Sequence, residues 1–375
     1  MMKVTCLKED LLQVLSLINR ISGIKTSLPF LGKVLLETKE NFFFLKATNL
    51  EISLTAKLSG KIESEGSLLC SARLLGEYVN LLEQEKIELI LEKNNLLIKT
   101  ASSQAKVNIE EAKDFPSFPA LSQKPFFSIP KSAFLDVAKK TTFATSQDLS
   151  KPVLSGVMLQ SKNGRLVAVG TDGFRLSEMV LPSISEISTP EFEKVIVPAK
   201  TILEITHLLE NHKDSAELLD FYLTEDKNQL GVKVGEVELL SRLLEADYPD
   251  YEKIIPQESQ TEVLVEKDPF IKLLKTVAVF APKEGLVIKM EVKENGQVKL
   301  LAEDKESGQG EAEIESEVKG AEVLLAFNSK FLMEGLNSID EEKVRFLIKD
   351  KFAPVVINGV NNQNYRHLIM PIRLN

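Results

Sequence analysis

The residues best able to do chemistry in this chain are three histidines, two cysteines and 55 acids. His207 and His212 lie five residues apart around the predicted end of a helix. They do not share a face as residues four apart would, so we expect no metal site there. No histidine, His367 included, lies near an obvious serine or cysteine nucleophile in the sequence. A catalytic pair of carboxylates that are distant in the sequence but close in space remains an open alternative. Nothing in the sequence pattern indicates an enzyme.

Nucleotide-binding motifs are missing from the sequence. It contains neither a G-x-x-x-x-G-K-[ST] phosphate loop nor a G-x-G-x-x-G after a strand. The nearest glycine cluster, at 307–310, lies among acids and predicts a turn. We therefore expect no cofactor.

Cys6 and Cys70 are the only cysteines, which argues against a disulfide framework or a cysteine-based metal site and fits a reducing cytoplasm.

The composition is that of a globular protein of two or three domains. The chain has 375 residues, of which 43% are hydrophobic and 27% charged, and this is enough apolar material for several cores. Its longest apolar runs are too short to span a membrane. The first residues lack the apolar stretch of a signal peptide, so we expect none. The net charge of -9 argues against a protein that coats nucleic acid with its whole surface.

The elements that would position these residues recur three times. Apolar residues at helical spacing predict one helix near the start of each third, and the three starts are 123 and 136 residues apart. A second helix follows in each third, with a basic residue near its start, and these basic residues are 127 and 130 apart. The six predicted helices span 8–19, 71–83, 131–144, 198–210, 267–280 and 328–338.

Turn residues repeat with a similar period. Asn41, Asn163 and Asn295 each lie between strand-like segments, and the last two precede glycine, the strongest short signal of a hairpin. After the first hairpin, 52–58 alternates as a half-buried strand does. Aromatic and proline residues around Pro116 recur around Pro249 and predict the ends of two domains.

We therefore predict an α+β protein made of three tandem copies of one domain, each with two helices packed on an antiparallel sheet. The boundaries fall near 120 and 256, which divides the chain into 1–120, 121–256 and 257–375. The alternative is a single large α+β protein with accidental internal similarity.

Four segments then carry a resemblance to a known family. They are Gly-Thr-Asp-Gly-Phe-Arg-Leu-Ser at 170–177, Asp-Tyr-Pro-Asp-Tyr-Glu-Lys-Ile-Ile-Pro at 247–256, Leu-Ile-Met-Pro-Ile-Arg-Leu-Asn at 368–375, and Leu-Pro-Phe-Leu-Gly at 28–32. Together they resemble the signatures of bacterial DNA polymerase III beta subunits, the sliding clamps. The resemblance covers the whole chain.

The resemblance implies a homodimeric DNA-clamp ring of pseudo-six-fold symmetry that encircles duplex DNA and gives the polymerase processivity. Twelve helices spaced about 9–10 Å apart would lie on a circle about 36 Å across. Subtracting one helix diameter, about 10–12 Å, leaves a hole of roughly 25 Å. A duplex about 20 Å wide passes through it with little clearance. Such a ring needs no catalytic site of its own.

Basic residues on or near the helices are the candidates to face DNA. The six predicted helices carry ten Lys/Arg and nine Asp/Glu, a weak positive excess over the acidic remainder of the chain. An ordinary solvated face remains the alternative for any one of them. The candidates are Arg20, Lys25, Arg73, Lys131, Lys139, Lys140, Lys200, Lys272, Lys275 and Lys330.

The resemblance also implies a groove that binds short peptides of the polymerase alpha subunit, the clamp loader and repair proteins. Apolar side chains would anchor the peptide and a few polar groups would orient it. For Leu154, Leu176, Met370 and Ile372 the alternative is that they are simply core. The residues implied are Leu154, Thr171, Gly173, Phe174, Arg175, Leu176, Pro249, Lys253, Ile254, Asn328, Phe331, Phe352, Pro354, Leu368, Ile369, Met370, Pro371, Ile372 and Arg373.

For the dimer interface, the family pattern implies that an edge strand with Val107 and Ile109 meets the third domain near Val279 and Phe280.

Two other classes of function compete with the sliding-clamp hypothesis. A single-strand binder would need basic grooves with interleaved aromatic residues, and the only aromatic run, 42–44, looks like a buried strand. A hydrolase or nuclease would use the scattered carboxylates with a divalent metal.

Overall fold

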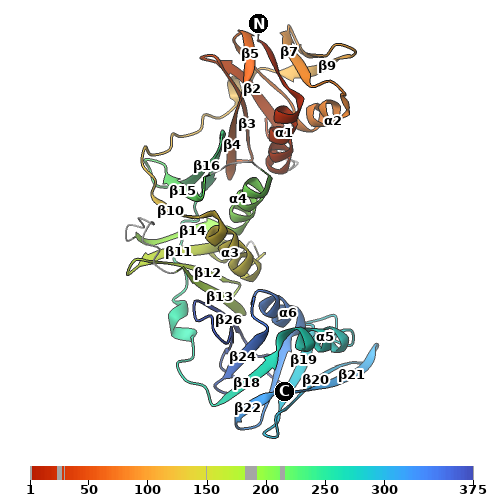
Figure 1. Ribbon diagram of the computed structural model, residues 1–375, viewed down its shortest axis with the longest axis vertical. Helices are drawn as coiled ribbons and strands as arrows, with labels where there is room; N and C mark the ends of the chain where they lie inside the picture. Colours follow the sequence, from red (N-terminus) through yellow and green to blue (C-terminus); the bar gives the residue numbers. More distant parts are fainter. Residues whose placement is uncertain are drawn as a thin grey trace. The chain divides into compact units, whose positions relative to one another are not determined.

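The structure, a computed structural model, describes residues 2–22, 28, 30–148, 150–181, 192–211 and 216–374. It divides into two compact units (Figure 1). The first comprises Met1–Phe134 and Thr201–Leu243, and the second comprises Leu135–Lys200 and Leu244–Asn375. The middle third of the chain therefore contributes to both units.

All six predicted helices are present among the described residues. The second helix of the first third begins at a serine cap, because the Ser71 hydroxyl accepts the N–H of Leu74 at 3.3 Å. The last helix begins at an amide cap, where Asn328 Oδ1 accepts the N–H of Phe331 at 3.1 Å. The helices are α1 (Lys8–Ser22), α2 (Ala72–Leu81), α3 (Lys131–Thr141), α4 (Ala199–Asn211), α5 (Lys267–Ala278) and α6 (Ser329–Asn337).

In the described part of the first unit, thirteen antiparallel strands form one sheet. The predicted alternation in β4 is confirmed, with Ile52, Leu54, Ala56 and Leu58 buried and the residues between them partly exposed. In spatial order the strands are β10 (Phe127–Pro130), β15 (Leu218–Leu223), β16 (Gln229–Val234), β17 (Val237–Arg242), β4 (Ile52–Leu58), β3 (Phe42–Thr48), β2 (Lys33–Lys39), β6 (Gly66–Ser71), β9 (Gln104–Glu110), β8 (Asn95–Lys99), β7 (Lys86–Glu92), β1 (Lys3–Leu7) and β5 (Gly60–Ser64).

The second unit holds two antiparallel sheets in its described residues. The larger runs β14 (Phe192–Pro198), β11 (Gly156–Lys162), β12 (Arg165–Thr171), β13 (Arg175–Leu181), β26 (Tyr365–Ile369), β25 (Val355–Gly359), β24 (Lys343–Ile348), β18 (Thr261–Glu266) and β22 (Glu317–Gly320). The smaller runs β21 (Gly308–Glu315), β20 (Gln297–Asp304), β19 (Val287–Val292) and β23 (Val323–Asn328).

The three predicted hairpins are confirmed. Asn41 and Asn163 have φ angles of 62° and 54°, and Gly296 has φ 88°. These left-handed conformations suit asparagine and glycine. The turns join β2 to β3, β11 to β12 and β19 to β20.

One backbone hydrogen bond marks the threefold repeat directly. The first residue of the first helix in each third donates its N–H to a glutamate carbonyl oxygen beyond the second helix. The pairs are Lys8 to Glu85 at 2.7 Å, Lys131 to Glu217 at 3.0 Å and Lys267 to Glu342 at 2.7 Å. The same bond in the same place shows that the three thirds are copies of one domain, as predicted. Their boundaries near 120 and 256 stay a prediction.

Both segments predicted to end a domain are anchored by aromatic side chains. Phe115 packs edge-on against Phe30, with ring centroids 6.2 Å apart. Tyr248 is buried, and its hydroxyl donates to the carbonyl oxygen of Val169 at 3.0 Å. No helix in the described ranges is both long enough and apolar enough to cross a membrane.

Candidate partner-binding site

The turn between β12 and β13 is held by its own polar side chains. Thr171 Oγ1 donates to the Arg175 carbonyl oxygen at 2.6 Å and accepts the Gly173 N–H at 3.1 Å. Asp172 Oδ1 accepts the N–H groups of Phe174 and Arg175 at 2.8 and 3.0 Å. Gly173 has φ 91°, and a Cβ there would meet nothing within 4 Å. The backbone conformation, rather than space, therefore favours glycine.

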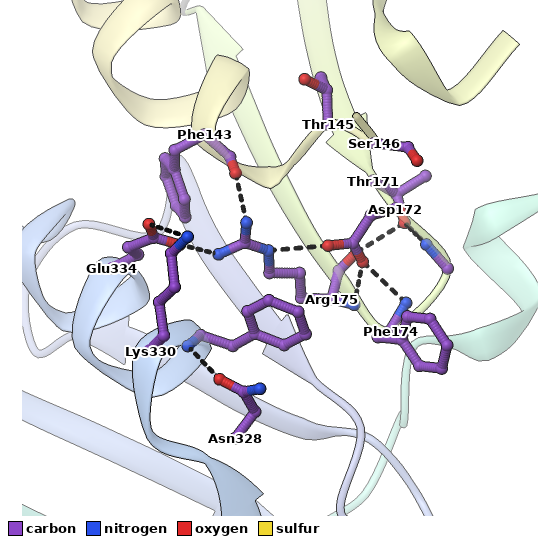
Figure 2. A network of polar contacts seen from close by, with 12 residues as sticks. Phe143, Thr145, Ser146, Thr171, Asp172, Phe174, Arg175, Asn328, Lys330 and Glu334 are labelled. Atoms are coloured by element: carbon purple, nitrogen blue, oxygen red, sulfur yellow. Dashed lines mark hydrogen bonds and ion pairs between the residues drawn. The ribbon is translucent and has the colours of Figure 1, made fainter. Parts of the chain in front are cut away.

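Arg175 ties this turn to the rest of the second unit (Figure 2). Its side chain is 7% exposed. Nε donates to Asp172 Oδ2 at 3.0 Å, and Nη2 donates to the Phe143 carbonyl oxygen at 2.5 Å. Nη1 donates to Glu334, and the Phe331 ring lies beneath, 4.2 Å from Cζ. The planar fork of arginine suits three such partners. Because each of its three nitrogens already has a partner, Arg175 positions the turn rather than presenting a free charge.

A cavity of about 290 Å³ opens beside this turn. The Met370 N–H donates to the Phe174 carbonyl oxygen at 2.9 Å, which brings the C-terminal segment against the turn. The lining residues are mostly apolar: Leu154, Thr171, Gly173, Phe174, Arg175, Leu176, Pro249, Asp250, Tyr251, Ile254, Pro354, Leu368 and Met370. The structure thus brings together eleven of the nineteen residues implied for the peptide groove.

The lining combines core residues with exposed ones. Leu154 and Leu176 are buried, as core residues are, and they also line the cavity. Phe174 is 64% exposed, Ile254 48% and Met370 37%. These three side chains leave apolar surface open to a ligand at the mouth of the cavity.

The other eight implied residues lie outside this cavity. Ile369 is buried in β26. Asn328 caps the start of α6, and the ring of Phe331 packs against the guanidinium of Arg175. Lys253 is exposed and pairs with Asp250 at 2.6 Å, and Pro371 is partly buried. The remaining three, Phe352, Ile372 and Arg373, line a second cavity.

Asp250 and Tyr251 also line the first cavity, although they are not among the residues predicted for the groove. Tyr251 is buried, and both burial and the neighbouring carboxylate of Glu178 raise the pKa of its phenol. Both residues lie in the segment whose Pro249 was selected. Their position directly after that proline was the available signal.

The candidate DNA-facing residues differ in how free their charges are. Arg20 donates to both carboxylate oxygens of Glu204, at 2.8 and 3.2 Å. Arg73 is 84% exposed and pairs with Glu77 at 2.8 Å. Lys330 is 61% exposed and lies 4.0 Å from Glu334. Acidic partners therefore neutralise part of the predicted positive surface.

Among the candidate DNA-facing lysines, three are exposed and form no ion pair within the described residues: Lys200, Lys272 and Lys275. Lys131 is half-buried at the start of α3. Lys25 lies outside the described residues. Arg73, Lys200 and Lys330 each occupy the second residue of their helix, which confirms the predicted repeat of basic helix starts.

The expectation for Lys140 was wrong. Its side chain is 5% exposed, and its Nζ lies 2.7 Å from Asp340 Oδ2. Lys139, which is 56% exposed, pairs with the other oxygen of the same carboxylate at 2.7 Å. Consecutive helix residues point about 100° apart, which lets Lys139 reach solvent while Lys140 points into the unit.

The residues implied for the dimer interface are only partly at the surface. Val107 is 6% exposed, so its side chain belongs to the core of its own unit and not to an interface. Ile109 is partly exposed, and Val279 is 73% exposed. Phe280 lies directly over Gly310 of β21, where a Cβ would approach its ring within 2.2 Å.

The fold brings one histidine beside a serine that is distant in the sequence. His367 Nδ1 is 2.8 Å from Ser177 Oγ, but both residues are fully buried. Burial lowers the pKa of the imidazole to about 3. A pair closed to solvent offers no route for a substrate. Among the described residues, no three His, Cys, Asp or Glu side chains cluster as metal ligands.

Comparisons with known proteins agree along the whole chain. Three family models describe the domains of the DNA polymerase III beta subunit. The model of the N-terminal domain matches residues 2–119 of this chain, that of the central domain matches 128–250, and that of the C-terminal domain matches 252–373. The chain is 27% identical to the beta sliding clamps of Synechocystis sp. and Pseudomonas aeruginosa, with 100% of each sequence covered.

Solved structures show the same similarity. The DNA polymerase III beta subunit of Thermotoga maritima superimposes with a TM-score of 0.91 at 26% identity, covering 100% of both chains. The sliding clamp of Pseudomonas aeruginosa bound to griselimycin gives a TM-score of 0.89 at 26% identity, again over 100% of both chains.

Proposed function

The chain belongs to the family of bacterial DNA polymerase III beta subunits and is a DNA sliding clamp; from this premise we propose that two copies close into a ring that holds polymerases on duplex DNA. The ring acts by topology, so we propose no catalytic site and no cofactor. We place it in the cytoplasm with the DNA that it encircles.

The main support for a closed ring is a strand pairing that is repeated between successive copies of the domain. The strand after the hairpin in the first copy, β4, pairs with β17, the last strand of the second copy. In the same way β13 of the second copy pairs with β26, the last strand of the third. The equivalent strands left over are β21, which ends its sheet, and β9, which pairs with β8 along 104–108 but with β6 only at Ile109 and Glu110. The described residues contain no partner from another copy of the domain for either strand.

We propose that β21 of one copy pairs with β9 of a second copy. An exposed strand edge invites pairing, and closing both junctions of a dimer leaves neither edge exposed. Val279 at the end of α5 and Phe280, which covers Gly310 in β21, would lie beside the junction. This retains the predicted interface but replaces the buried Val107 side chain by the backbone edge of its strand.

For DNA, we propose loose, screened contacts from the exposed cations of the helices. Arg73, Lys200 and Lys330 occupy equivalent positions in three helices, which suits a duplex whose phosphates present the same charge at every angle. Contacts of this kind weaken as salt rises and carry no sequence information, so they permit sliding.

For partners, we propose that the first cavity takes a short peptide from the polymerase or another clamp-binding protein. The exposed Phe174, Ile254 and Met370 surround a rigid turn. An apolar pocket with a preformed backbone suits an extended peptide with apolar anchors. The loader and repair proteins would use the same pocket in turn.

The test is retention on circular and linear duplex DNA after loading, with the mass measured by light scattering. A ring of two 41.8 kDa chains weighs about 84 kDa, stays on circles and is lost when the circle is cut. A 41.8 kDa monomer, or equal retention on both DNAs, would contradict a topological mechanism.

A further inference from the structure

A third cavity, of about 660 Å³, lies in the first unit, between the sheet and the linker at 112–121. We call it the linker cavity. The linker forms one wall, and the floor is the face of the sheet around Leu35, Lys46 and Thr55. Lys46 alternates along β3 with the buried Leu45 and Ala47, so its face of the sheet points away from the core.

The turn beside this floor repeats the turn of the first cavity. Thr48 Oγ1 donates to the Ile52 carbonyl oxygen at 3.0 Å and accepts the Leu50 N–H at 3.0 Å. Thr171 forms the same two bonds in the turn between β12 and β13. The two threonines are 123 residues apart. A shift of 123 residues therefore relates this face of the first unit to a face of the second.

The same shift relates the strand positions of the two faces. Three floor positions have counterparts 123 residues later, and their cross-strand pairing is the same in both units. The counterparts are Leu35 and Met158, Lys46 and Val169, and Thr55 and Glu178.

In the second unit, tyrosines of the chain itself cover this face. Tyr248 and Tyr251 are buried in one cluster with Met158 and Val169. The Tyr248 hydroxyl donates to the Val169 carbonyl oxygen at 3.0 Å. Tyr251 lies beside Glu178, and both burial and this carboxylate raise the pKa of its phenol. The occupant of the face is thus a pair of aromatic rings that carry hydroxyl groups.

In the first unit, the equivalent linker leaves the face open. The rings of Phe115 and Phe118 pack against each other, with centroids 5.7 Å apart, and Phe115 also packs against Phe30. At the other end Leu121 closes on the sheet, where a Cβ on Gly231 would lie 2.5 Å from its side chain. The linker is therefore held at both ends, and a preformed wall costs a ligand little ordering entropy.

The open floor is polar where its counterpart is apolar. Lys46 binds Glu37, with Nζ 2.7 Å from Oε2, and Lys233 Nζ lies 3.7 Å from Glu238 Oε2. These two pairs contain all four charged side chains that line the cavity. Because each charge already has a partner, the cavity favours a neutral ligand over an ionised one. A phenol fits, since its ring covers apolar surface and its hydroxyl donates to a carboxylate.

We propose that the linker cavity is a second docking site, where a partner protein inserts tyrosine side chains of an extended segment. The partner supplies to the first unit what the linker around Tyr248 supplies to the second unit. One ring lies against Phe44 and the linker, and its hydroxyl donates to Glu238, which pairs across the strands with Thr55. This site shares no residue with the first cavity and does not rest on the function proposed for it.

The test attaches peptides beside the cavity through a disulfide. Ser67→Cys places a thiol at an exposed position that lines it. The native Cys6 and Cys70 are buried, and burial raises the pKa of both thiols to about 12, so they stay unreactive. The full-length variant is equilibrated with Cys-Asp-Tyr-Pro-Asp-Tyr, supplied as a mixed disulfide with cysteamine, at increasing β-mercaptoethanol. Intact-protein mass spectrometry measures the fraction attached.

The peptide carries the sequence of 247–251 after its cysteine. It should withstand about tenfold more reductant than a peptide with serine in place of both tyrosines, because it buries aromatic surface. It should withstand about threefold more than the phenylalanine version, which lacks the hydroxyl groups. At Ser102→Cys, an exposed serine of the same unit outside the cavity, all three peptides should be retained equally.

Two further variants, each combined with Ser67→Cys, locate the contacts. Thr55→Tyr fills the cavity from its own floor and should abolish the preference for tyrosine over serine, while urea unfolding checks the fold. Glu238→Gln, at a partly buried residue, should abolish only the preference for tyrosine over phenylalanine. Equal retention of the tyrosine and serine peptides, or a preference that survives Thr55→Tyr, would show that the cavity is not a docking site. Equal retention of the tyrosine and phenylalanine peptides would rule out tyrosine as the anchor.

Discussion

The ammonium group of Lys140 lies inside the second unit, 2.7 Å from the carboxylate of Asp340. Lys139 binds the other oxygen of that carboxylate from solvent. Hydrogen bonds from both lysines lower the pKa of Asp340 to about 2. The pair joins α3, in the second copy of the domain, to the segment after α6, in the third copy.

Replacing Asp340 by asparagine should therefore destabilise the protein. The change leaves the buried Lys140 ammonium without its counter-ion; because Asp340 is half exposed, we expect a loss of about 1–3 kcal/mol rather than the larger cost of a fully buried pair. Lys139→Met removes only the exposed partner and should cost less than about 1 kcal/mol. Urea unfolding of the two variants measures the difference. Equal losses would show that burial of Lys140 does not matter.

The linkage of Asp340 to pH has a defined sign. Its carboxyl pKa is lower in the folded protein than its ordinary value of 3.8. The pair's contribution is therefore complete above pH 3.8 and is lost as the pH falls toward about 2.

His367 predicts a second pH dependence at milder pH. Its folded pKa of about 3 lies below the ordinary value of 6.5, so the unfolded chain binds the proton first and stability falls as the pH drops below 6.5. The slope approaches about 1.4 kcal/mol per pH unit. His367→Gln should reduce the slope between pH 6 and pH 5, where few carboxylates titrate, although it lowers stability at pH 7. Unfolding midpoints at these pH values test this, and identical slopes would contradict it.

Arg175 should not tolerate lysine. An ammonium group cannot reach Asp172, Glu334 and the Phe143 carbonyl oxygen together, nor stack as a plane on Phe331. Arg175→Lys should loosen the turn, lower the melting temperature and weaken binding of a peptide to the first cavity by about tenfold. Arg165→Lys, at an exposed arginine of β12, is the matched control. Peptide affinity that survives Arg175→Lys would show that the turn does not need this support.

Glu204 should restrain the contact between Arg20 and DNA. Glu204→Gln removes the charge that Arg20 now binds through two hydrogen bonds. One more phosphate contact should steepen the dependence of log K on log salt by about 0.9. Anisotropy titrations of a short linear duplex over a range of salt measure the slope. Glu210→Gln, at an exposed residue of the same helix, should leave it unchanged. If both variants behave alike, Arg20 does not contact DNA.

Local patterns predicted the helices and hairpins well because local physics determines them. Apolar residues at helical spacing must share a buried face, and Asn163-Gly164 accepts the left-handed turn of a hairpin. The environment of Lys140 was not predictable, since its partner Asp340 is 200 residues away in sequence. Periodicity identifies the faces of a helix but not the charge that a distant copy places against them.

The peptide groove was predicted through family motifs rather than through composition. Thr171 and Gly173 could be placed because their turn is local and its hydrogen bonds close within five residues. Tyr251 was missed because its role depends on Glu178, which the fold brings to it from another strand.

Val279 provides the sharpest test of ring closure. It is 73% exposed beside the uncovered edge strand β21, so Val279→Asp should leave the fold intact. At a dimer junction the same change buries a carboxylate, which has no counter-ion there and should cost several kcal/mol. The mass from light scattering should then fall from about 84 kDa toward 41.8 kDa, and retention on circular DNA should be lost. Leu324→Asp places the same charge on the opposite edge of this sheet and should keep both. A Val279→Asp variant that stays dimeric would exclude the end of α5 from the interface and direct the search to other edges.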